Sequence, residues 1–424
     1  MPKRASVFWT LLLCLFCGLV AYVTPILILD PAARAWFHPA FLSEWLRIGQ
    51  AMRLTATHYY EPENVSYDQL GLHALDGMVE KLDRYSEFLP PSAFDYFQQQ
   101  TAQTYVGIGV AFEKLDGIPT ITRVYPQSGA AEAGILPGDQ ILAVEKKPLA
   151  EESLETIFQQ LRGAAGTTVN LELHTPNDAA SRLVSVERRK INTDTVSARP
   201  LTADGIAHVR INEFESRTAE ELRATLAQLR NRGMQKLILD LRGNPGGLVV
   251  AAVDTIGLFC PANTLVTSSQ SRTPSENHAY RTSGNPDFPA LPIVILVNRQ
   301  SASAAEIVSG ALQDLQRAVI IGDRTFGKGV VQSIYKLDSD HALKITTARY
   351  MLPSGRSIQD SGVQPDIFQP MDQRVRTLRA IADTWAEIGR AEEFASRFGP
   401  PPADTQIEAA LDFLRALPPS EQQP

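Results

Sequence analysis

The sequence predicts an α/β fold in which a parallel sheet forms the larger domain and a β-rich module precedes it. After Gly205, short continuous apolar runs alternate with helical patterns, as in parallel sheets that helices cover on both faces. Between Tyr105 and Arg189, short strands alternate with glycine turns instead. Residues 41–100 have mainly helical periodicity. We therefore expect helices at both ends of the chain and an inserted β-rich domain.

The composition is that of an ordinary globular protein. The chain has 424 residues, of which 44% are hydrophobic and 21% charged, and its length suggests two to four domains. A net charge of −7 without a basic block argues against a nucleic-acid-binding protein, because phosphate binding needs clustered Lys and Arg. No H-E-x-x-H motif or His and Cys cluster occurs, so we expect no metal and no cofactor. Cys260 stands alone beside an apolar stretch, and we assign it a structural role.

Residues 1–35 differ from the rest of the chain. Lys3 and Arg4 precede an apolar run from Val7 to Leu29, which as a helix can span the ~30 Å hydrocarbon core of a bilayer. Positive residues stay on the cytoplasmic side, which places the remainder outside the cytoplasm. The small residues of Ala33-Arg34-Ala35 also fit a cleavage site. The segment is a signal peptide or an N-terminal anchor, and the length of the run favours the anchor.

Residues 36–100 are expected to form a helical region that acts as a scaffold or a dimer element. Apolar side chains recur at helical spacing until Pro90-Pro91 breaks the pattern. The recurring positions are Leu70, His73, Ala74, Met78 and Leu82.

The pattern of residues 101–190 predicts a β-rich module. The loop Gly107-Ile108-Gly109-Val110 opens it, the turn Pro137–Leu142 follows, a helix is expected at Leu154–Leu161, and a strand at Thr168–His174. This order resembles a PDZ domain; the alternative is a glycine-rich hairpin in an unrelated β module. The resemblance implies that a peptide adds a strand to the sheet edge while free N–H groups hold its terminal carboxylate.

We expect residues 191–370 to form the parallel-sheet domain. Residues 371–424 are expected to form a helical region that ends in an amphipathic helix from Ile407 to Leu417. Thr218-x-x-Glu221 fits a capping box that begins a helix, and Gly233 ends that helix. The expected strands are Ile206–Ile211, Leu237–Leu241, Ile293–Val297, Ala318–Ile321 and Val330–Leu337.

Loops after three of these strands contain the residues suited to catalysis, and ligands of open α/β sheets gather at the carboxyl ends of strands. In the first loop, Gly246 and Gly247 precede a helical run and leave backbone N–H groups uncovered, which can stabilise an oxyanion. In the second, Ser303 lies where a strand ends and a helix begins. Ser303-x-x-Glu306 also fits a capping box, so this segment alone favours a helix cap.

The third loop, Gly322–Gln332, places Lys328 in a glycine frame. It nearly matches the phosphate-binding P-loop G-x-x-x-x-G-K-[ST], but Gly329 replaces the hydroxyl residue and a strand follows, so we reject nucleotide binding. A lysine withdrawn from water can lose its proton and act as a base. No His lies in a catalytic motif and no G-x-S-x-G elbow occurs, which leaves a Ser–Lys pair.

Several segments, in the same order, resemble the carboxyl-terminal processing peptidases, or tail-specific proteases. The likeness covers Phe41–Leu417 and implies a crotonase-like α/β protease core with a PDZ domain inserted ahead of it. Two departures are small: Ala305 stands where a second Ser is common, and Met351-Leu352-Pro353 replaces a more usual Tyr-Thr-Pro. The matching segments are Lys81–Ser86, Ser301–Glu306, Gly310–Asp314, Thr325–Gln332, Tyr350–Gln359 and Gly362–Asp366.

The resemblance implies a serine endopeptidase in which Ser303 is the nucleophile, Lys328 the general base and Gln332 the residue that orients the lysine. The amides of Gly246 or Gly247 and of Ala304 would form the oxyanion hole. Expected substrates are exported proteins or peptides with accessible, apolar C-termini, at the periplasmic face of the inner membrane. The sequence leaves a homodimer and an adaptor protein open as partners. Two alternatives remain: a Ser–Lys amidase acting on small molecules, and a peptide-binding scaffold without catalysis.

Overall fold

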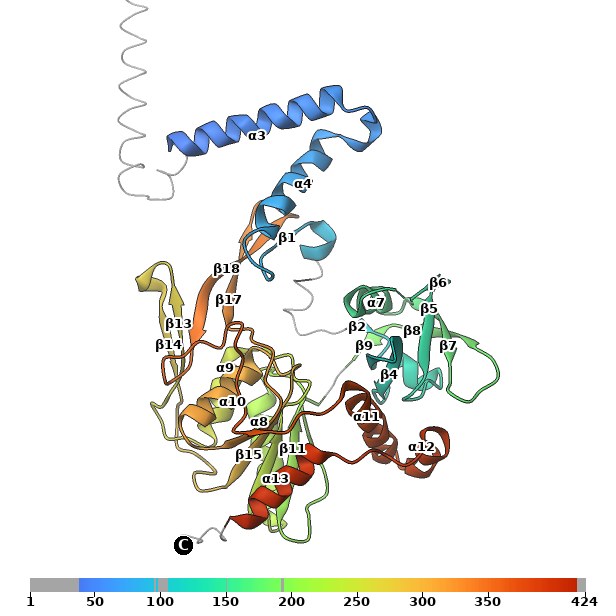
Figure 1. Cartoon of the computed structure of the whole chain (residues 1–424), viewed down its shortest axis with the longest axis vertical. Coiled ribbons are helices and arrows are strands. Elements are labelled where there is room, and N and C mark those ends of the chain that lie inside the picture. Colours follow the sequence, from blue (N-terminus) through green and yellow to red (C-terminus); the bar gives the residue numbers. More distant parts are fainter. Residues whose placement is uncertain (1–37, 95–96, 98–105, 150, 192–193, 418–424) are drawn as a thin grey trace, which may run out of the picture. The chain divides into compact units, whose positions relative to one another are not determined.

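The computed structural model describes residues 38–94, 97, 106–149, 151–191 and 194–417, which divide into two compact units at Pro90 and Pro91 (Figure 1). The predicted signal peptide or anchor, residues 1–35, lies outside the described residues. Among the helices of the described ranges, none is both long and apolar enough to cross a membrane.

The first unit is helical, as predicted. It contains α3 (Pro39–His58), η1 (Pro62–Asn64), α4 (Tyr67–Glu80) and the short strand β1 (Glu87–Leu89). A capping box begins α4, since Ser66 accepts from the Gln69 N–H and Gln69 accepts from the Ser66 N–H. Four of the five recurring positions lie in α4, but Met78 is 55% exposed and Leu82 lies beyond its end. The helical periodicity therefore does not mark a buried face here.

The β-rich module forms as expected within the second unit. Its main sheet has the strand order β3-β4-β5-β7-β8, with β3 at one edge, and its core includes Ile121, Ile141 and Leu171. The predicted helix and strand have the expected bounds, α7 (Leu154–Leu161) and β7 (Thr168–His174). The other elements are β2 (Val106–Gly107), β3 (Val110–Leu115), β4 (Ile118–Val124), α6 (Gly129–Glu132), β5 (Gln140–Val144), β6 (Lys147–Pro148), β8 (Arg182–Glu187) and β9 (Arg189–Lys190).

The predicted parallel sheet is also present. Its order is β10-β11-β12-β15-β16-β19, and all neighbours from β11 to β19 are parallel, while β10 is antiparallel. Every residue of β12 and β15 is buried, which explains their continuous apolar sequences. The strands are β10 (Val196–Ala198), β11 (Ile206–Ile211), β12 (Lys236–Asp240), β15 (Ile293–Val297), β16 (Val319–Gly322) and β19 (Ile367–Phe368).

Helices cover both faces of this sheet (Figure 1). On one face, alternate strand residues such as Leu237 and Ile295 pack against α8 (Thr218–Asn231), α9 (Val249–Gly257) and α10 (Ala304–Asp314). On the other face, Ile238 and Leu296 pack against α13 (Thr405–Ala416). The two alternating sets follow from the period of two along a strand.

The capping box predicted at Thr218 is wrong. Thr218 lies inside the first turn of α8, and the N-cap is Arg217, which makes no side-chain cap hydrogen bond. The Glu221 carboxylate instead accepts hydrogen bonds from the N–H and hydroxyl of Thr195, at 2.9 and 2.7 Å. A tertiary partner therefore replaces the local one. Gly233 follows the end of α8 with φ 97°, as its expected role requires.

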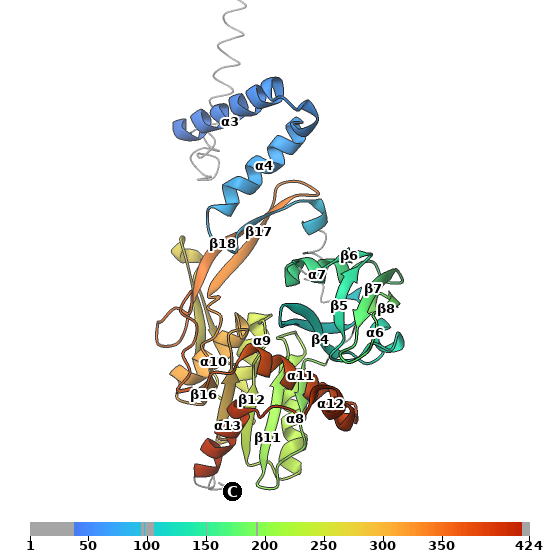
Figure 2. The ribbon, with the colours of Figure 1, turned by 45° about the vertical axis from the view of Figure 1, so that its right-hand side comes forward.

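A second, antiparallel set of strands lies beside the helices of the core. The strand β18 pairs with β17 and β13, and β13 pairs with β14; Figure 2 shows β17 and β18 as a long hairpin. The bounds are β13 (Leu265–Ser271), η2 (Pro274–Glu276), β14 (His278–Arg281), β17 (Val330–Lys336) and β18 (Ala342–Met351).

Two C-terminal helices, α11 (Gln373–Glu387) and α12 (Ala391–Phe398), connect the parallel-sheet domain to the β module. The indole N–H of Trp385 donates to the carbonyl of Pro137 at 2.8 Å, and the Thr384 hydroxyl donates to the carbonyl of Thr122 at 3.0 Å. These buried contacts hold the Pro137 turn against α11.

Cys260 is buried, and burial raises the pKa of its thiol.

Candidate active site

The three loops selected from the sequence meet at one edge of the parallel sheet. They follow β12, β15 and β16, which are neighbours in the sheet and run in the same direction, so their carboxyl ends lie together. The Ser301 hydroxyl donates to the carbonyl of Leu241 at 2.8 Å, and the Phe326 N–H donates to the carbonyl of Ser301 at 3.0 Å. The second loop is therefore bonded to the first and to the third.

Ser303 has a strained backbone at the junction between β15 and α10. Its φ of 55° and ψ of −115° lie in a region that residues with a side chain rarely adopt. Such a conformation costs roughly 1–3 kcal/mol and persists only where the surroundings enforce it, which is a feature of functional sites. Ser303 is half-buried and stands at the N-terminus of α10, where the helix dipole favours negative charge.

The Glu306 carboxylate joins the serine loop to the lysine loop. It is completely buried. One oxygen, Oε2, accepts from the N–H of Ser303 at 2.9 Å and from the N–H of Lys328 at 2.8 Å. The other, Oε1, accepts from the Thr325 hydroxyl at 2.5 Å and from the Gly327 N–H at 2.7 Å. The backbone nitrogens of Ser303 and Lys328 thus converge on a single oxygen atom, although 25 positions separate the two residues in the sequence.

Lys328 and Gln332 both belong to the segment that leads from the third loop into β17 (Val330–Lys336). Lys328 is half-buried just before β17, and Gln332 is half-buried within β17. The pairing of β17 with β18 is irregular between Val331 and Gln332, and such bulges re-aim side chains. The Gly329 N–H donates to the side-chain oxygen of Gln359 at 2.9 Å, and this bond fixes the backbone just before β17.

The first loop lies directly against the serine. Gly246 has φ 108°, and a Cβ atom there would be 2.7 Å from the Ser303 Cβ, so only glycine fits. The Gly246 N–H donates to the side-chain oxygen of Asn244 at 2.8 Å and is therefore already used. In the part of the chain that the structure describes, the N–H groups of Gly247 and Ala304 have no acceptor. Of the two predicted glycines, Gly247 is the one with a donor available.

The candidate peptide-binding loop of the β module is equally constrained. At Gly109, φ is 81° and a Cβ atom would be 2.2 Å from the Ser128 Cβ. The Ser128 hydroxyl donates to the Gly109 carbonyl at 3.3 Å, which anchors the predicted loop Gly107–Val110. Phe112 lies on the edge strand β3, and the centroid of its ring is 6.5 Å from the ring centroid of Phe158 on α7. The sheet edge that is expected to receive a peptide therefore lies beside α7.

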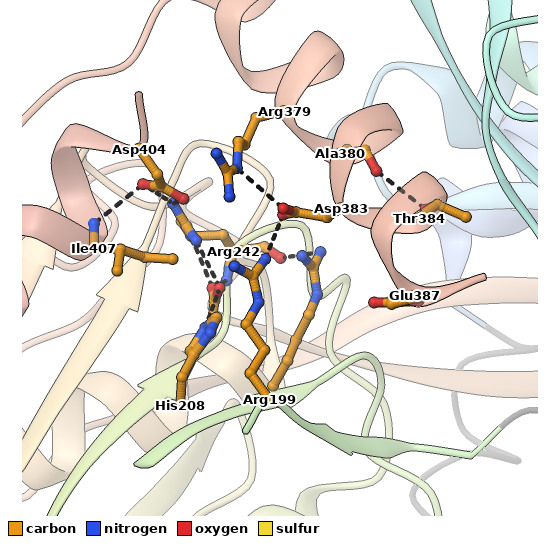
Figure 3. Close-up of polar contacts among 12 residues, drawn as sticks. Arg199, His208, Arg242, Arg379, Ala380, Asp383, Thr384, Glu387, Asp404 and Ile407 are labelled. Atoms are coloured by element: carbon orange, nitrogen blue, oxygen red, sulfur yellow. Dashed lines mark hydrogen bonds and ion pairs between the residues drawn. The ribbon is translucent and has the colours of Figure 1, made fainter. Parts of the chain in front are cut away.

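A buried ionic network, which the sequence did not predict, fixes the end of β12 (Figure 3). Arg242 donates to Asp240 at 2.7 Å and to Asp404, the N-cap of α13, at 2.9 Å, while His208 lies 3.1 Å from Asp240. Burial alone would raise the pKa of Asp240, but the Arg242 guanidinium, the hydrogen bond with His208 and the charge of Arg210 together outweigh burial and hold that pKa well below its usual range. The network ties α13 to the start of the first loop. Among the described residues, no cluster of His, Cys, Asp and Glu could hold a metal ion.

Comparisons with known proteins identify the family. The family model for Peptidase family S41 matches residues 205–368, and that for the PDZ domain matches residues 120–174. A probable CtpA-like serine protease of Staphylococcus saprophyticus is 32% identical over 338 residues, covering 79% of this chain and 68% of that protein. The chain belongs to peptidase family S41. It is a serine-type peptidase with a PDZ domain, as the sequence predicted.

Other relatives of this S41 peptidase extend the likeness over almost its whole length. A carboxyl-terminal-processing protease of Synechocystis is 29% identical over 435 residues and covers 98% of this chain and 95% of that protein. The solved structure of a photosystem II D1 C-terminal processing protease has a TM-score of 0.53 and 27% identity, over 77% of this chain and 93% of that one. These likenesses confirm the predicted α/β protease fold with an inserted PDZ domain.

Proposed function

We propose that this S41 peptidase is an endopeptidase that cleaves exported proteins with a Ser–Lys dyad, after its PDZ domain has bound their apolar C-termini. Ser303 is the nucleophile, Lys328 the general base and Gln332 the residue that orients the lysine amine. One observation carries the proposal most directly. The serine and lysine loops are joined at one buried carboxylate, and two N–H groups beside the serine remain without an acceptor in the described structure.

The chemistry follows from these roles. The neutral amine of Lys328 takes the hydroxyl proton of Ser303 as the serine oxygen bonds to the scissile carbonyl carbon. The N–H groups of Gly247 and Ala304 stabilise the resulting oxyanion. The lysine then gives its proton to the leaving amine, an ester to Ser303 remains, and water hydrolyses that ester in a second round.

The surroundings of the candidate site support an apolar substrate. Leu248 and Val250 follow the glycine pair and are 44% and 62% exposed, and Phe326, two residues before Lys328, is 45% exposed. Exposed apolar side chains that gather in one place mark binding surfaces, whereas single ones are common on any protein. Around catalytic loops, the natural occupants are the side chains on either side of the scissile bond.

The location of the enzyme remains part of the proposal. The apolar run Val7–Leu29 and its preceding positive residues support export and anchoring at the periplasmic face of the inner membrane. Protease digestion of intact spheroplasts checks this: the catalytic part of an exported, anchored enzyme is degraded while cytoplasmic markers survive. Full protection would rule out export.

Replacement of the nucleophile tests the catalytic proposal. Ser303→Ala should abolish cleavage of an unfolded protein substrate while the circular dichroism spectrum and melting temperature stay close to those of the wild type. Near-normal cleavage by the Ala variant would reduce Ser303 to a helix cap. In the wild-type protein, cleavage of small amides but not of unfolded proteins would favour the amidase alternative, and a stable fold without any hydrolysis would favour the scaffold.

A binding measurement tests the role of the PDZ domain. Unstructured peptides ending in apolar residues should bind the Ser303→Ala protein with a free carboxyl end and lose most of their affinity when amidated. The reason is that N–H groups of the Gly107–Val110 loop would hold the carboxylate. Equal affinity for the acid and amide forms would contradict this role.

A further inference from the structure

Glu306 does more than cap its helix. A capping carboxylate needs to satisfy only the N–H groups of the first turn, and here that is the Ser303 N–H alone. The remaining three donors come from residues 325–328 of another loop. Three of the four hydrogen bonds to the Glu306 carboxylate thus come from outside α10.

We infer that Glu306 is a positioning residue that holds the strained Ser303 and the Lys328 loop in catalytic register. The inference rests on the proposed Ser–Lys function. Ser303 needs a reason to keep φ at 55°, and the hydrogen bond from its own N–H to Glu306 Oε2 supplies one. Because the same oxygen accepts from the Lys328 N–H, a movement of either loop strains the other bond.

An ionised carboxylate suits this role better than a neutral amide. All four partners of Glu306 in the described structure are donors, three N–H groups and one hydroxyl, and a carboxylate accepts at both oxygens. Hydrogen bonds to an ionised acceptor are roughly twice as strong as neutral ones. A glutamine of the same shape offers one carbonyl oxygen, so two of the four donors would face an NH₂ group and lose their acceptor.

Thr325 provides a second handle on the same junction. Its hydroxyl donates to Glu306 at 2.5 Å and accepts from the N–H of Val363 at 2.6 Å. Thr325→Val keeps the side-chain shape and removes only this hydroxyl. It should therefore loosen the lysine loop while leaving the Ser303–Glu306 bond intact, with an effect smaller than that of Glu306→Gln.

Ser309 offers a matched control on the same helix. It is fully buried, and its hydroxyl donates to the backbone carbonyls of Ala305 at 2.8 Å and Glu306 at 3.4 Å, both within α10, without contacting the Glu306 carboxylate or the loop of residues 325–328. Ser309→Ala reports what loss of a buried polar group on α10 does to stability alone.

The test measures covalent labelling of the full-length enzyme by a fluorophosphonate, in which the serine oxygen bonds to phosphorus and displaces fluoride, with the rate constant expressed per labelled site. Glu306→Gln should lower this rate constant and kcat about 100-fold, because a shift of about 1 Å in reacting groups costs about that factor. The KM of Glu306→Gln should change less than about threefold. The control Ser309→Ala should be labelled at the wild-type rate. If Glu306→Gln does not fold, Thr325→Val takes its place, with at least about a tenfold loss expected.

Two results would overturn the assignment. One is a Glu306→Gln enzyme, or the Thr325→Val enzyme used in its place, that is labelled at a rate within about threefold of the wild type. The other is a variant with fewer labelled sites but a normal rate per site, which is the behaviour of a residue that supports folding only. Failure of the proposed function itself looks different, because the wild-type enzyme would then not be labelled at Ser303.

Discussion

Replacing Gly246 by alanine should inactivate the enzyme by pushing on Ser303. A Cβ atom at Gly246 would be 2.7 Å from the Ser303 Cβ, 2.8 Å from the Ala302 carbonyl oxygen and 3.0 Å from the Ala304 nitrogen. Two of these three neighbours are backbone atoms, so no side-chain rotation relieves the overlap. Either the first loop moves away or the serine moves, and both break the arrangement of the proposed nucleophile and the proposed oxyanion donors.

The stability cost has two parts. A residue with a Cβ at φ 108° costs about 1–2 kcal/mol relative to glycine. Overpacking against fixed atoms adds about 1–3 kcal/mol. Gly246→Ala should therefore lower the free energy of unfolding by about 2–5 kcal/mol. Displacement of the serine should lower kcat/KM by about 100-fold or more.

Gly233 provides the matched control. It has a similar φ of 97°, but no atom lies within 4 Å of its added Cβ. Gly233→Ala should cost only the conformational part, about 1–2 kcal/mol, with normal kcat/KM. Urea unfolding followed by circular dichroism and steady-state cleavage of a fluorogenic peptide measure both quantities. A fully active Gly246→Ala enzyme would refute the placement of Gly246 against the nucleophile.

Three further outcomes follow from the buried network and the composition of the site. Arg242→Leu should destabilise the protein by about 3–5 kcal/mol in urea unfolding, because it leaves the carboxylates of Asp240 and Asp404 buried without their partner; a loss below about 1 kcal/mol would contradict this. The lowered pKa of Asp240 implies that its contribution to stability is present above about pH 4, near its unfolded value, and is lost as the pH falls toward its folded value. The wild-type unfolding free energy should thus fall more steeply with acid below pH 4 than that of Arg242→Leu, and parallel curves would argue against the pair. Chelators should leave peptide cleavage unchanged, whereas inactivation that zinc reverses would contradict a Ser–Lys mechanism.

The sequence predicted the elements that follow local rules. Ile293–Val297 coincides with β15 because an uninterrupted apolar run between Pro292 and Asn298 matches a fully buried parallel strand. The nearness of Ser303, Lys328 and Gly246 followed from their places after neighbouring strands. What the sequence could not show were partners distant along the chain. The capping box expected at Thr218 does not form, and Glu221 bonds to Thr195 instead. The box expected at Ser303-x-x-Glu306 does form, but three of the four donors to Glu306 come from residues 325–328.

The same reason explains the oxyanion glycines and the ionic network. Nothing in the Asn-Pro-Gly-Gly sequence indicated that the Asn244 side chain would take the Gly246 N–H and leave that of Gly247. Asp240 lies inside the predicted strand Leu237–Leu241, and the sequence does not show that its partner Arg242 also bonds to Asp404, 162 positions later. The one signal available was the charge itself, since a carboxylate in a buried strand needs a cation.

Covalent labelling followed by mass spectrometry tests the central assignment most directly. The wild-type enzyme, treated with a fluorophosphonate, should gain a single adduct that peptide mapping places on Ser303. Lys328→Arg should gain none over the same period, because a guanidinium stays charged and cannot take the serine proton. An adduct on another residue, or labelling of the Arg variant at the wild-type rate, would contradict the Ser303–Lys328 dyad.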